Sequence, residues 1–305
     1  MTEQQSAPVC YRHPRKETYV RCVRCDRPIC PDCMNQAPVG FQCPSCVSYG
    51  RKTVRQARAA FGGGLGGGSG LVTKTLVGIN VGVFLLGFAF AGSGAMGGLL
   101  GGGTTWLHVY GAMVGVPAKL QFAGQVILLD GVAGGEYYRL LTSMFLHYGV
   151  VHLLFNMYVL WVIGRYLERD LGPLRYLALY LVSGLGGGVL TYLFAAGSMA
   201  AGASGCIFGL FGAMVFINRK LGRDNSGIYV LLGLNLVLTF VISNISWTGH
   251  IGGLLAGLGL GAALAYAPRQ RRGLYQGAAF AAVLIVFAVV IVVRTNSLAA
   301  AYGVA

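Results

Sequence analysis

Seven long apolar runs, separated by short loops, dominate this chain after its polar beginning. They lie near residues 71–91, 140–163, 174–195, 204–217, 228–242, 248–265 and 277–293. About 20 apolar residues are enough for a helix to cross a bilayer. Within a bilayer only helices and closed barrels satisfy every backbone polar group. Because 55% of the residues are hydrophobic and only 10% are charged, we expect an all-α polytopic membrane protein with a polar appendage.

The basic residues predict how the chain lies in the membrane. They gather before the first run, and between the second and third, the fourth and fifth, and the sixth and seventh runs. With seven spans all these clusters fall on one side, which the positive-inside rule assigns to the cytoplasm. We therefore expect a multi-pass protein of the cell membrane with a cytoplasmic amino terminus. The same pattern accounts for the net charge of +14, so no nucleic-acid partner is expected.

Composition divides the chain into four parts. Residues 1–50 are polar, hold seven of the eight cysteines and are expected to form a cytoplasmic metal-binding domain. Residues 51–70 begin with basic side chains and end in a glycine run, which indicates a flexible tether. Residues 71–295 form the expected transmembrane domain, and residues 296–305 form a short tail.

Four closely spaced ligand pairs mark the first part of the chain. They are Cys10 and His13, Cys22 and Cys25, Cys30 and Cys33, and Cys43 and Cys46. Eight such ligands suffice for two tetrahedral zinc sites, and reducing cytosol disfavours the alternative of a disulfide framework. The short spacing between the second and third pairs favours interleaving, with pairs one and three on one ion and pairs two and four on the other. Consecutive pairing remains an alternative. Four protein ligands per ion leave no open position, so both zinc ions are expected to be structural.

Polar side chains stand in or beside the apolar runs, where their cost makes each one a candidate for function. The informative ones are His147, His152, Asn156, Ser204 and His250. Counted at 1.5 Å per residue from the basic ends, His152 lies about 20 Å, Ser204 about 22 Å and His250 about 27 Å into the membrane. All three then fall in the outer half of a hydrocarbon core about 30 Å thick. Because the fourth run is too short to cross alone, residues 197–203 are expected to dip in from the outer face and open a cavity.

Two ridges of small residues are expected to bring a serine and a histidine together. One ridge is Gly205, Gly209 and Ala213, and the other is Gly249, Gly253, Gly257 and Gly261. Such ridges let helices pack backbone against backbone. Ser204 and His250 adjoin the first members of the two ridges, so contact between the ridges would set a nucleophile beside a base.

These residues stand in motifs that resemble those of the rhomboid family of intramembrane serine proteases. The sequence Gly202-Ala203-Ser204-Gly205 resembles the family's nucleophile motif, and residues 249–253 resemble its histidine motif. His147, His152 and Asn156 resemble the signature of the second helix, and the flanks at 136–142 and 164–168 look like those of the family. The likeness covers roughly residues 71–267 and implies a six-helix core followed by a seventh, C-terminal helix. The amino-terminal domain resembles B-box-type zinc domains.

The resemblance implies a role for each matching residue. Ser204 would be the nucleophile and His250 its base, while His152, Asn156 and the Ser204 backbone N–H would form the oxyanion site. Supporting positions would be His147, Gly202, Gly205, Phe208 and Gly253. Phe208 stands where the family often has a tyrosine, and would stack on His250 without a hydroxyl. Glu168 is expected beyond the cytoplasmic end of the second helix, so we expect a Ser–His dyad rather than a triad. The implied substrates are transmembrane segments of other proteins, cut near the outer face by way of an acyl-enzyme.

Two other functions remain as alternatives. A rhomboid-like membrane chaperone without proteolysis would not need the dyad and oxyanion residues, and all of them are present. A transporter or channel gated by the zinc domain would be expected to carry acidic residues in its spans, and the sequence predicts no Asp or Glu there. A protein partner of the zinc domain is a further hypothesis.

Overall fold

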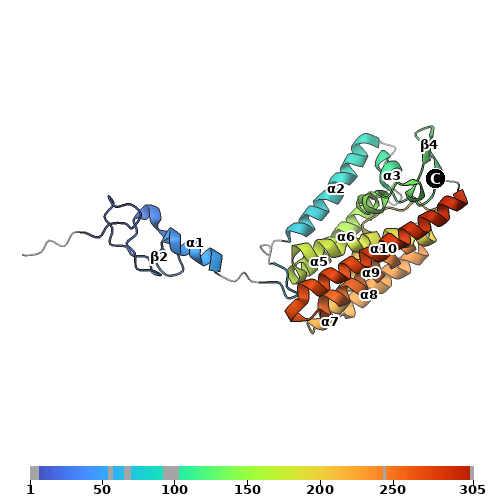
Figure 1. Cartoon of the computed structure of the whole chain (residues 1–305). Helices are drawn as coiled ribbons and strands as arrows, with labels where there is room; N and C mark the ends of the chain where they lie inside the picture. The colour runs from blue at the N-terminus through green and yellow to red at the C-terminus, as the bar shows by residue number, and fades with distance from the viewer. Residues whose placement is uncertain (1–6, 54–57, 65–69, 92–102, 243–244, 303–305) are drawn as a thin grey trace, which may run out of the picture. The chain divides into compact units, whose positions relative to one another are not determined.

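The computed structural model describes residues 7–53, 58–64, 70–91, 103–242 and 245–302. The chain separates into two compact units, Met1–Ala57 and Arg58–Ala305 (Figure 1). Cysteines form most of the core of the small unit, and long helices form most of the large unit.

The core of the small unit consists almost entirely of cysteines. Its regular elements are a 3-10 turn η1 (Pro31–Cys33), strands β1 (Asn35–Gln36) and β2 (Phe41–Gln42), and helix α1 (Pro44–Thr53). The two strands pair antiparallel. The buried cluster contains Ile29 together with Cys10, Cys22, Cys30, Cys33 and Cys43. The ligand side chains therefore occupy the place that an apolar core takes in larger domains.

The large unit is a bundle of long apolar helices, drawn in Figure 1 from cyan to red. They are α2 (Leu71–Ala91), α5 (Val150–Leu171), α6 (Pro173–Phe194), α7 (Ser204–Lys220), α8 (Ser226–Val241), α9 (Trp247–Tyr266) and α10 (Arg272–Tyr302). Five of these are long and apolar enough to cross a membrane, while α7 and α8 are shorter. The expected all-α fold with seven long helices is confirmed within the described residues.

The second long helix differs from its prediction at both ends. The sequence predicts residues 140–163, whereas α5 begins at Val150 and continues to Leu171. Before it the chain forms a short helix α4 (Arg139–Thr142) and a 3-10 turn η4 (Ser143–Phe145). Gly172, with φ of +82°, ends α5, and the proline after it starts α6. The helix therefore includes Arg165 and Arg169, whereas the third arginine of that basic cluster, Arg175, lies in α6.

Glu168 and Asp170 lie inside α5, so the expectation that the spans hold no acidic residue is wrong. Glu168 also lies within the helix and not beyond it. Its carboxylate accepts hydrogen bonds from the backbone N–H groups of Val72 and Thr73 at 3.0 and 2.9 Å, and from the Thr73 hydroxyl at 2.8 Å. These N–H groups, at the start of α2, have no partner within the helix itself. The helix dipole favours a negative charge at this end. Asp170 forms an ion pair with Arg223. Both carboxylates therefore hold helix ends in place.

The segment between α2 and α5 is partly regular. It contains helix α3 (Trp106–Gly111), strands β3 (Ala118–Phe122) and β4 (Gln125–Leu129), and a 3-10 turn η3 (Val132–Gly134). The two strands form an antiparallel hairpin. Residues 92–102 of this segment lie outside the described part of the chain.

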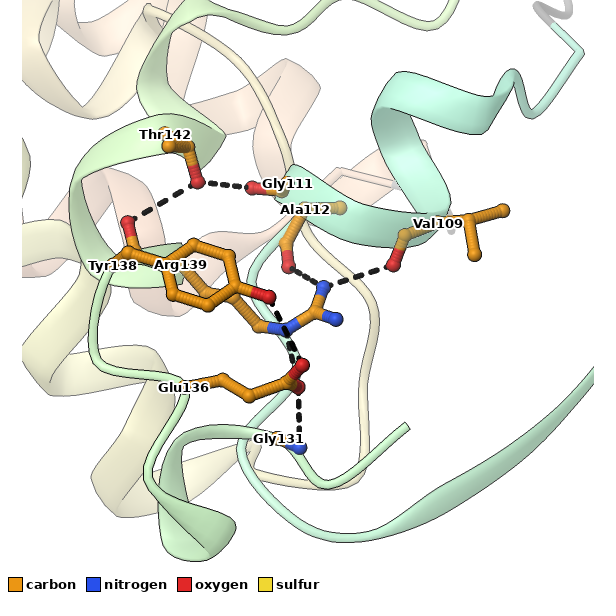
Figure 2. A network of polar contacts seen from close by, with 8 residues as sticks. All are labelled: Val109, Gly111, Ala112, Gly131, Glu136, Tyr138, Arg139 and Thr142. Atoms are coloured by element: carbon orange, nitrogen blue, oxygen red, sulfur yellow. Dashed lines mark hydrogen bonds and ion pairs between the residues drawn. The ribbon is translucent and has the colours of Figure 1, made fainter. Parts of the chain in front are cut away.

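Arg139 anchors this segment from a fully buried position, as Figure 2 shows. Its Nε donates to Glu136 at 2.7 Å, and its Nη1 donates to the carbonyl oxygens of Val109 and Ala112, each at 3.0 Å. The guanidinium thus ties the end of α3 to the start of α4.

Glu136 supplies the negative charge in this network. It accepts hydrogen bonds from Arg139, from the Tyr138 hydroxyl at 2.9 Å and from the Gly131 backbone N–H at 2.7 Å (Figure 2). Burial by itself raises the pKa of Glu136, but these hydrogen bonds outweigh it and hold the pKa below its ordinary value.

The expectation of a flexible tether is wrong for residues 58–64. Phe61 is buried, and its N–H donates to the Asp170 carbonyl at 3.2 Å. Gly63 passes so close to α5 that a Cβ on it would lie 2.0 Å from the Leu171 carbonyl oxygen. The buried ring of Phe61 and the absence of a side chain at Gly63 together let this segment pack on α5. Residues 54–57 and 65–69 of the predicted linker lie outside the described part.

Candidate active site

Glycines set the distance between α7 and α9. A Cβ on Gly253 would lie 2.0 Å from the carbonyl oxygen of Gly205, and a Cβ on Gly257 would lie 2.0 Å from that of Gly209. Real side chains do not fit at such distances, so the two backbones touch directly. The predicted contact between the two small-residue ridges is confirmed.

This contact brings the amino-terminal ends of the two helices together. Ser204 is the first residue of α7, and its Oγ lies 2.8 Å from Nε2 of His250 in the first turn of α9. Phe208, one turn after the serine, stacks on the imidazole, with ring centroids 4.1 Å apart and an angle of 16° between the planes. His250 is only 7% exposed. A hydroxyl and an imidazole therefore share a hydrogen bond inside the bundle, and an aromatic ring holds the imidazole on one face.

A second hydroxyl contacts the other nitrogen of the same imidazole. Thr239 on α8 places its Oγ1 2.6 Å from His250 Nδ1. The same hydroxyl donates to the carbonyl oxygen of Asn235, one turn earlier, at 2.7 Å. Thr239 is buried, unlike most of α8, in which the only other buried residue is Ile228.

These contacts select one tautomer of His250. A hydroxyl carries a single hydrogen, and the hydrogen of Thr239 is directed at the Asn235 carbonyl, which can only accept. Thr239 must then accept from His250, so Nδ1 bears a proton, and in the neutral imidazole Nε2 is free. In that form Nε2 can accept from the Ser204 hydroxyl, 2.8 Å away. A neutral imidazole with a free Nε2 facing the serine is the form that a general base needs.

Of the sequence-predicted residues before and in α5, His152 lies near Ser204, and Asn156 and His147 lie next to His152. His152 and Asn156 are one turn apart, and the Asn156 side-chain amide donates to the His152 carbonyl at 2.9 Å. The His147 ring is buried, with its centroid 4.9 Å from that of His152. It also lines a cavity that extends toward α2 and does not include Ser204.

Gly202 allows His152 to approach the serine. A Cβ on Gly202 would lie 3.0 Å from His152 Nε2 and 3.5 Å from Ser204 Oγ. Its φ of +144° is also a conformation that favours glycine. Gly205 lets α7 pack closely on α9, because a Cβ there would lie 3.1 Å from the Gly249 carbonyl oxygen. The structure therefore brings His152, Ser204, Phe208 and His250 together, while Asn156 and His147 contact His152.

Thr239 is the residue that sequence reasoning missed. A threonine in an apolar helix usually bonds its own backbone one turn back, and Thr239 does this as well. The sequence does contain one indication of a polar helix face. Asn235 and Thr239 are polar and lie four residues apart in an otherwise apolar run. Without the helix arrangement, nothing connects them to His250.

The small unit contains two groups of residues that can each hold a metal ion. Cys10, His13, Cys30 and Cys33 form one group, and Cys22, Cys25, Cys43 and Cys46 form the other; the ligand atoms within each lie within 4.8 Å of one another. This confirms the interleaved grouping of the four pairs and rejects the consecutive one.

The spacing of the ligand atoms fits a tetrahedral ion. Cys25 Sγ and Cys43 Sγ are 3.7 Å apart, and His13 Nδ1 lies 3.2 Å from Cys30 Sγ. Two sulfurs on a tetrahedral ion with bonds of about 2.3 Å would be about 3.8 Å apart. The Cys43 backbone N–H donates to Cys22 Sγ at 3.2 Å, which is the kind of contact that stabilises a thiolate ligand.

The fold and the site together define an integral, multi-pass helical membrane protein in which a buried histidine contacts a partly buried serine. Residues 134–267 match the Rhomboid domain family. The chain is 43% identical over 138 residues to the rhomboid protease GluP of Bacillus subtilis, covering 44% of this chain and 27% of GluP. It is 39% identical over 165 residues to RHOMBOID-like protein 4 of Arabidopsis thaliana, covering 50% of this chain and 42% of that protein.

A third relative is matched over most of its length. The chain is 40% identical over 133 residues to YdcA of Bacillus subtilis, whose name also refers to rhomboid proteases, and covers 67% of YdcA against 42% of itself. The chain belongs to the rhomboid family. The matched region spans less than half of GluP and of RHOMBOID-like protein 4.

Proposed function

We propose that this chain is an intramembrane serine endopeptidase in which Ser204 is the nucleophile and His250 is the general base. The observation that carries the proposal is the 2.8 Å contact between Ser204 Oγ and the free Nε2 of a buried imidazole. Membership in a family whose relatives include GluP, named as a rhomboid protease, supports the reaction class.

In this mechanism His250 Nε2 accepts the Ser204 proton while Oγ bonds to the carbonyl carbon of the scissile peptide. The C–N bond then breaks, and His250 returns the proton to the leaving amine. Water attacks the acyl-enzyme with its proton going to the same nitrogen, which releases the second product and restores the serine. Phe208 and Thr239 keep the ring oriented through both proton transfers.

His152, Asn156 and the Ser204 backbone N–H are the proposed oxyanion donors. The geometry around Gly202 supports this role, because His152 Nε2 and Ser204 Oγ flank the same small space. The start of α7 adds the favourable end of a helix dipole. One side-chain donor of this kind contributes about 2.7–4 kcal/mol in soluble serine proteases.

The substrates proposed for this site are transmembrane segments of other membrane proteins, cut near the outer face of the cell membrane. The position of Ser204 and His250 at the amino-terminal ends of α7 and α9 supports this placement, because the opposite ends carry the basic residues. By the positive-inside rule those basic ends, and the amino terminus, face the cytoplasm.

The test is cleavage of a fluorescent transmembrane substrate by the purified full chain in liposomes. Ser204→Ala and His250→Ala should each lower kcat/KM by at least about a thousandfold while the unfolding temperature changes little. Ser183→Ala is the matched control, since Ser183 is a buried serine of α6 whose hydroxyl has no hydrogen-bond partner among the described residues. Labelling by a fluorophosphonate should likewise require Ser204. Cleavage that survives in Ser204→Ala would reject Ser204 as the nucleophile, whereas a wild-type chain that neither cleaves the substrate nor takes the label would favour a membrane chaperone or a transporter.

We also propose that the two ligand groups of the small unit each hold a structural Zn²⁺. The support is chemical: seven sulfurs and one imidazole, in two sets of four, suit zinc better than harder cations. With four protein ligands each, neither ion would have a position for substrate.

A further inference from the structure

Three arginines come together at the end of the large unit that lies opposite to Ser204. Arg58 belongs to the docked segment 58–64, Arg175 lies in the first turn of α6, and Arg272 is the first residue of α10. A Cβ on Gly62 would lie 3.1 Å from Arg272 Cδ and 3.8 Å from Arg175 Nη2, so both side chains reach the same point. Arg58 pairs with Gly64 in the backbone turn that contains Gly62, and Arg272 bonds the Ala60 carbonyl of the same turn.

Among the described residues of the large unit, no carboxylate forms an ion pair with this cluster. The chain has nine acidic residues, and only five of them belong to residues 58–305. Their positions account for all five: Glu168 caps α2, Asp170 pairs with Arg223, Asp224 contacts Ser226, Glu136 pairs with Arg139, and Asp130 adjoins β4 in the loop before α5. The three arginines therefore repel one another without compensation in the part of the large unit that the structure describes.

The backbone adds to the positive potential. Arg175 and Arg272 stand at the starts of α6 and α10, where the helix dipole disfavours a cation. Unpaired N–H groups at helix starts bind anions readily. Both helices are membrane-length apolar segments, so their starts lie where a bilayer meets water.

Neutral contacts hold the guanidinium groups in position and leave donors free. Arg175 Nε donates to Gln276 Oε1 at 2.7 Å, and Arg272 Nη1 donates to the Ala60 carbonyl at 3.0 Å. Gln276 is buried and donates in turn to the carbonyls of Phe61 and Leu264. Arg272 Nε is buried and has no hydrogen-bond partner among the described residues. Each guanidinium has five donors, so several remain for a ligand.

We propose that Arg58, Arg175 and Arg272 form a binding site for a phosphate group, supplied by the headgroup of an anionic phospholipid. Arginine suits phosphate because its planar fork donates two parallel hydrogen bonds. Three cations require a ligand with net negative charge, which phosphatidylglycerol has and phosphatidylcholine lacks. The bound headgroup joins the segment before α2 to the starts of α6 and α10, and so links distant parts of the chain.

The test uses the full chain in dodecyl maltoside, with the unfolding temperature followed during titration of short-chain phosphatidylglycerol, phosphatidylcholine or inorganic phosphate. The wild-type unfolding temperature should rise by about 5 °C with phosphatidylglycerol and should not rise with phosphatidylcholine. An equal rise with inorganic phosphate alone would identify a free anion as the source, whereas a rise confined to phosphatidylglycerol identifies the lipid.

The double variant Arg175→Gln/Arg272→Gln should bind phosphatidylglycerol at least about tenfold more weakly. The matched control Arg269→Gln/Arg271→Gln removes the same charge from exposed neighbours and should behave like wild type. Without lipid the double variant loses the hydrogen bonds of Arg175 to Gln276 and of Arg272 to Ala60, so the quantity compared is each protein's rise in unfolding temperature with lipid. A rise that is equal in both double variants would overturn the proposal.

Discussion

His250 is contacted on both ring nitrogens by hydroxyl groups and on one face by Phe208. In soluble serine proteases a carboxylate holds the imidazole in its reactive tautomer. Here a chain of neutral groups performs that orienting task, running from Ser204 through His250 and Thr239 to a helix carbonyl. A neutral partner suits an apolar bundle, because an ionised carboxylate would have to be desolvated there.

Thr239 is therefore predicted to be a positioning residue. Thr239→Val removes the acceptor for His250 Nδ1–H at nearly constant volume and should lower kcat by about ten- to a hundredfold with KM unchanged. Thr239→Ser keeps the hydroxyl and should retain most of the rate. The measurement is steady-state cleavage of the transmembrane substrate, paired with unfolding temperatures. If valine and serine variants were equally active, or equally impaired, the hydroxyl would have no such role.

At the scale of elements, two different devices hold the bundle in register. The glycine contacts of α7 and α9 act without side chains, so they fix the depth of Ser204 relative to His250 within a narrow range. The loop before α5 is held in the opposite way, by one buried cation that satisfies carbonyl groups from α3 and a carboxylate near α4 (Figure 2). The second device depends on charge and should respond to pH.

Glu136→Gln should destabilise the protein by about 3 kcal/mol, because it leaves the fully buried Arg139 without its ionic partner. The pKa of Glu136 is depressed in the folded state. Its contribution is therefore complete above the ordinary glutamate pKa of about 4.3 and is lost as the pH falls through the lower, folded value. Unfolding free energies measured from pH 7 down to pH 3 should fall more steeply for wild type than for Glu136→Gln. Asp130→Asn, which changes an exposed carboxylate of the same segment, is the control; parallel curves for wild type and Glu136→Gln would contradict the assignment.

The chain folds into two units, and different interactions stabilise each of them. The large unit buries an extended apolar core between its helices. Within residues 7–53 of the small unit, Ile29 alone joins the cysteines in the buried cluster, which is too little apolar surface to offset the entropy of folding. The proposed zinc ions would supply the missing stability, since binding free energy in such domains is folding free energy.

Chelation should separate the two units. Treatment of the full chain with 1,10-phenanthroline should abolish hydrogen-exchange protection within residues 7–50, because each structural zinc contributes about 10–16 kcal/mol in zinc-finger peptides. Protection within α5–α9 should not change. Metal analysis before treatment should give about two zinc ions per chain. Persistent protection of residues 7–50 in metal-free protein would show that the cysteines are not a metal-dependent core.

Some features of this protein were determined by the sequence alone. Hydropathy predicted the membrane bundle because a bilayer leaves few ways to satisfy a backbone, and the Cys–His pairs predicted metal sites because ligand chemistry is local. Ser204, His250 and the two glycine ridges were found because polar or small residues are conspicuous in apolar runs. The tertiary structure alone decided which partners meet across the bundle. Thr239 on the imidazole, Glu168 on the start of α2 and Phe61 on α5 are contacts between segments far apart in the chain or on separate helices. Each residue on its own has an ordinary local explanation, so only the packing of the helices determines which contact it makes.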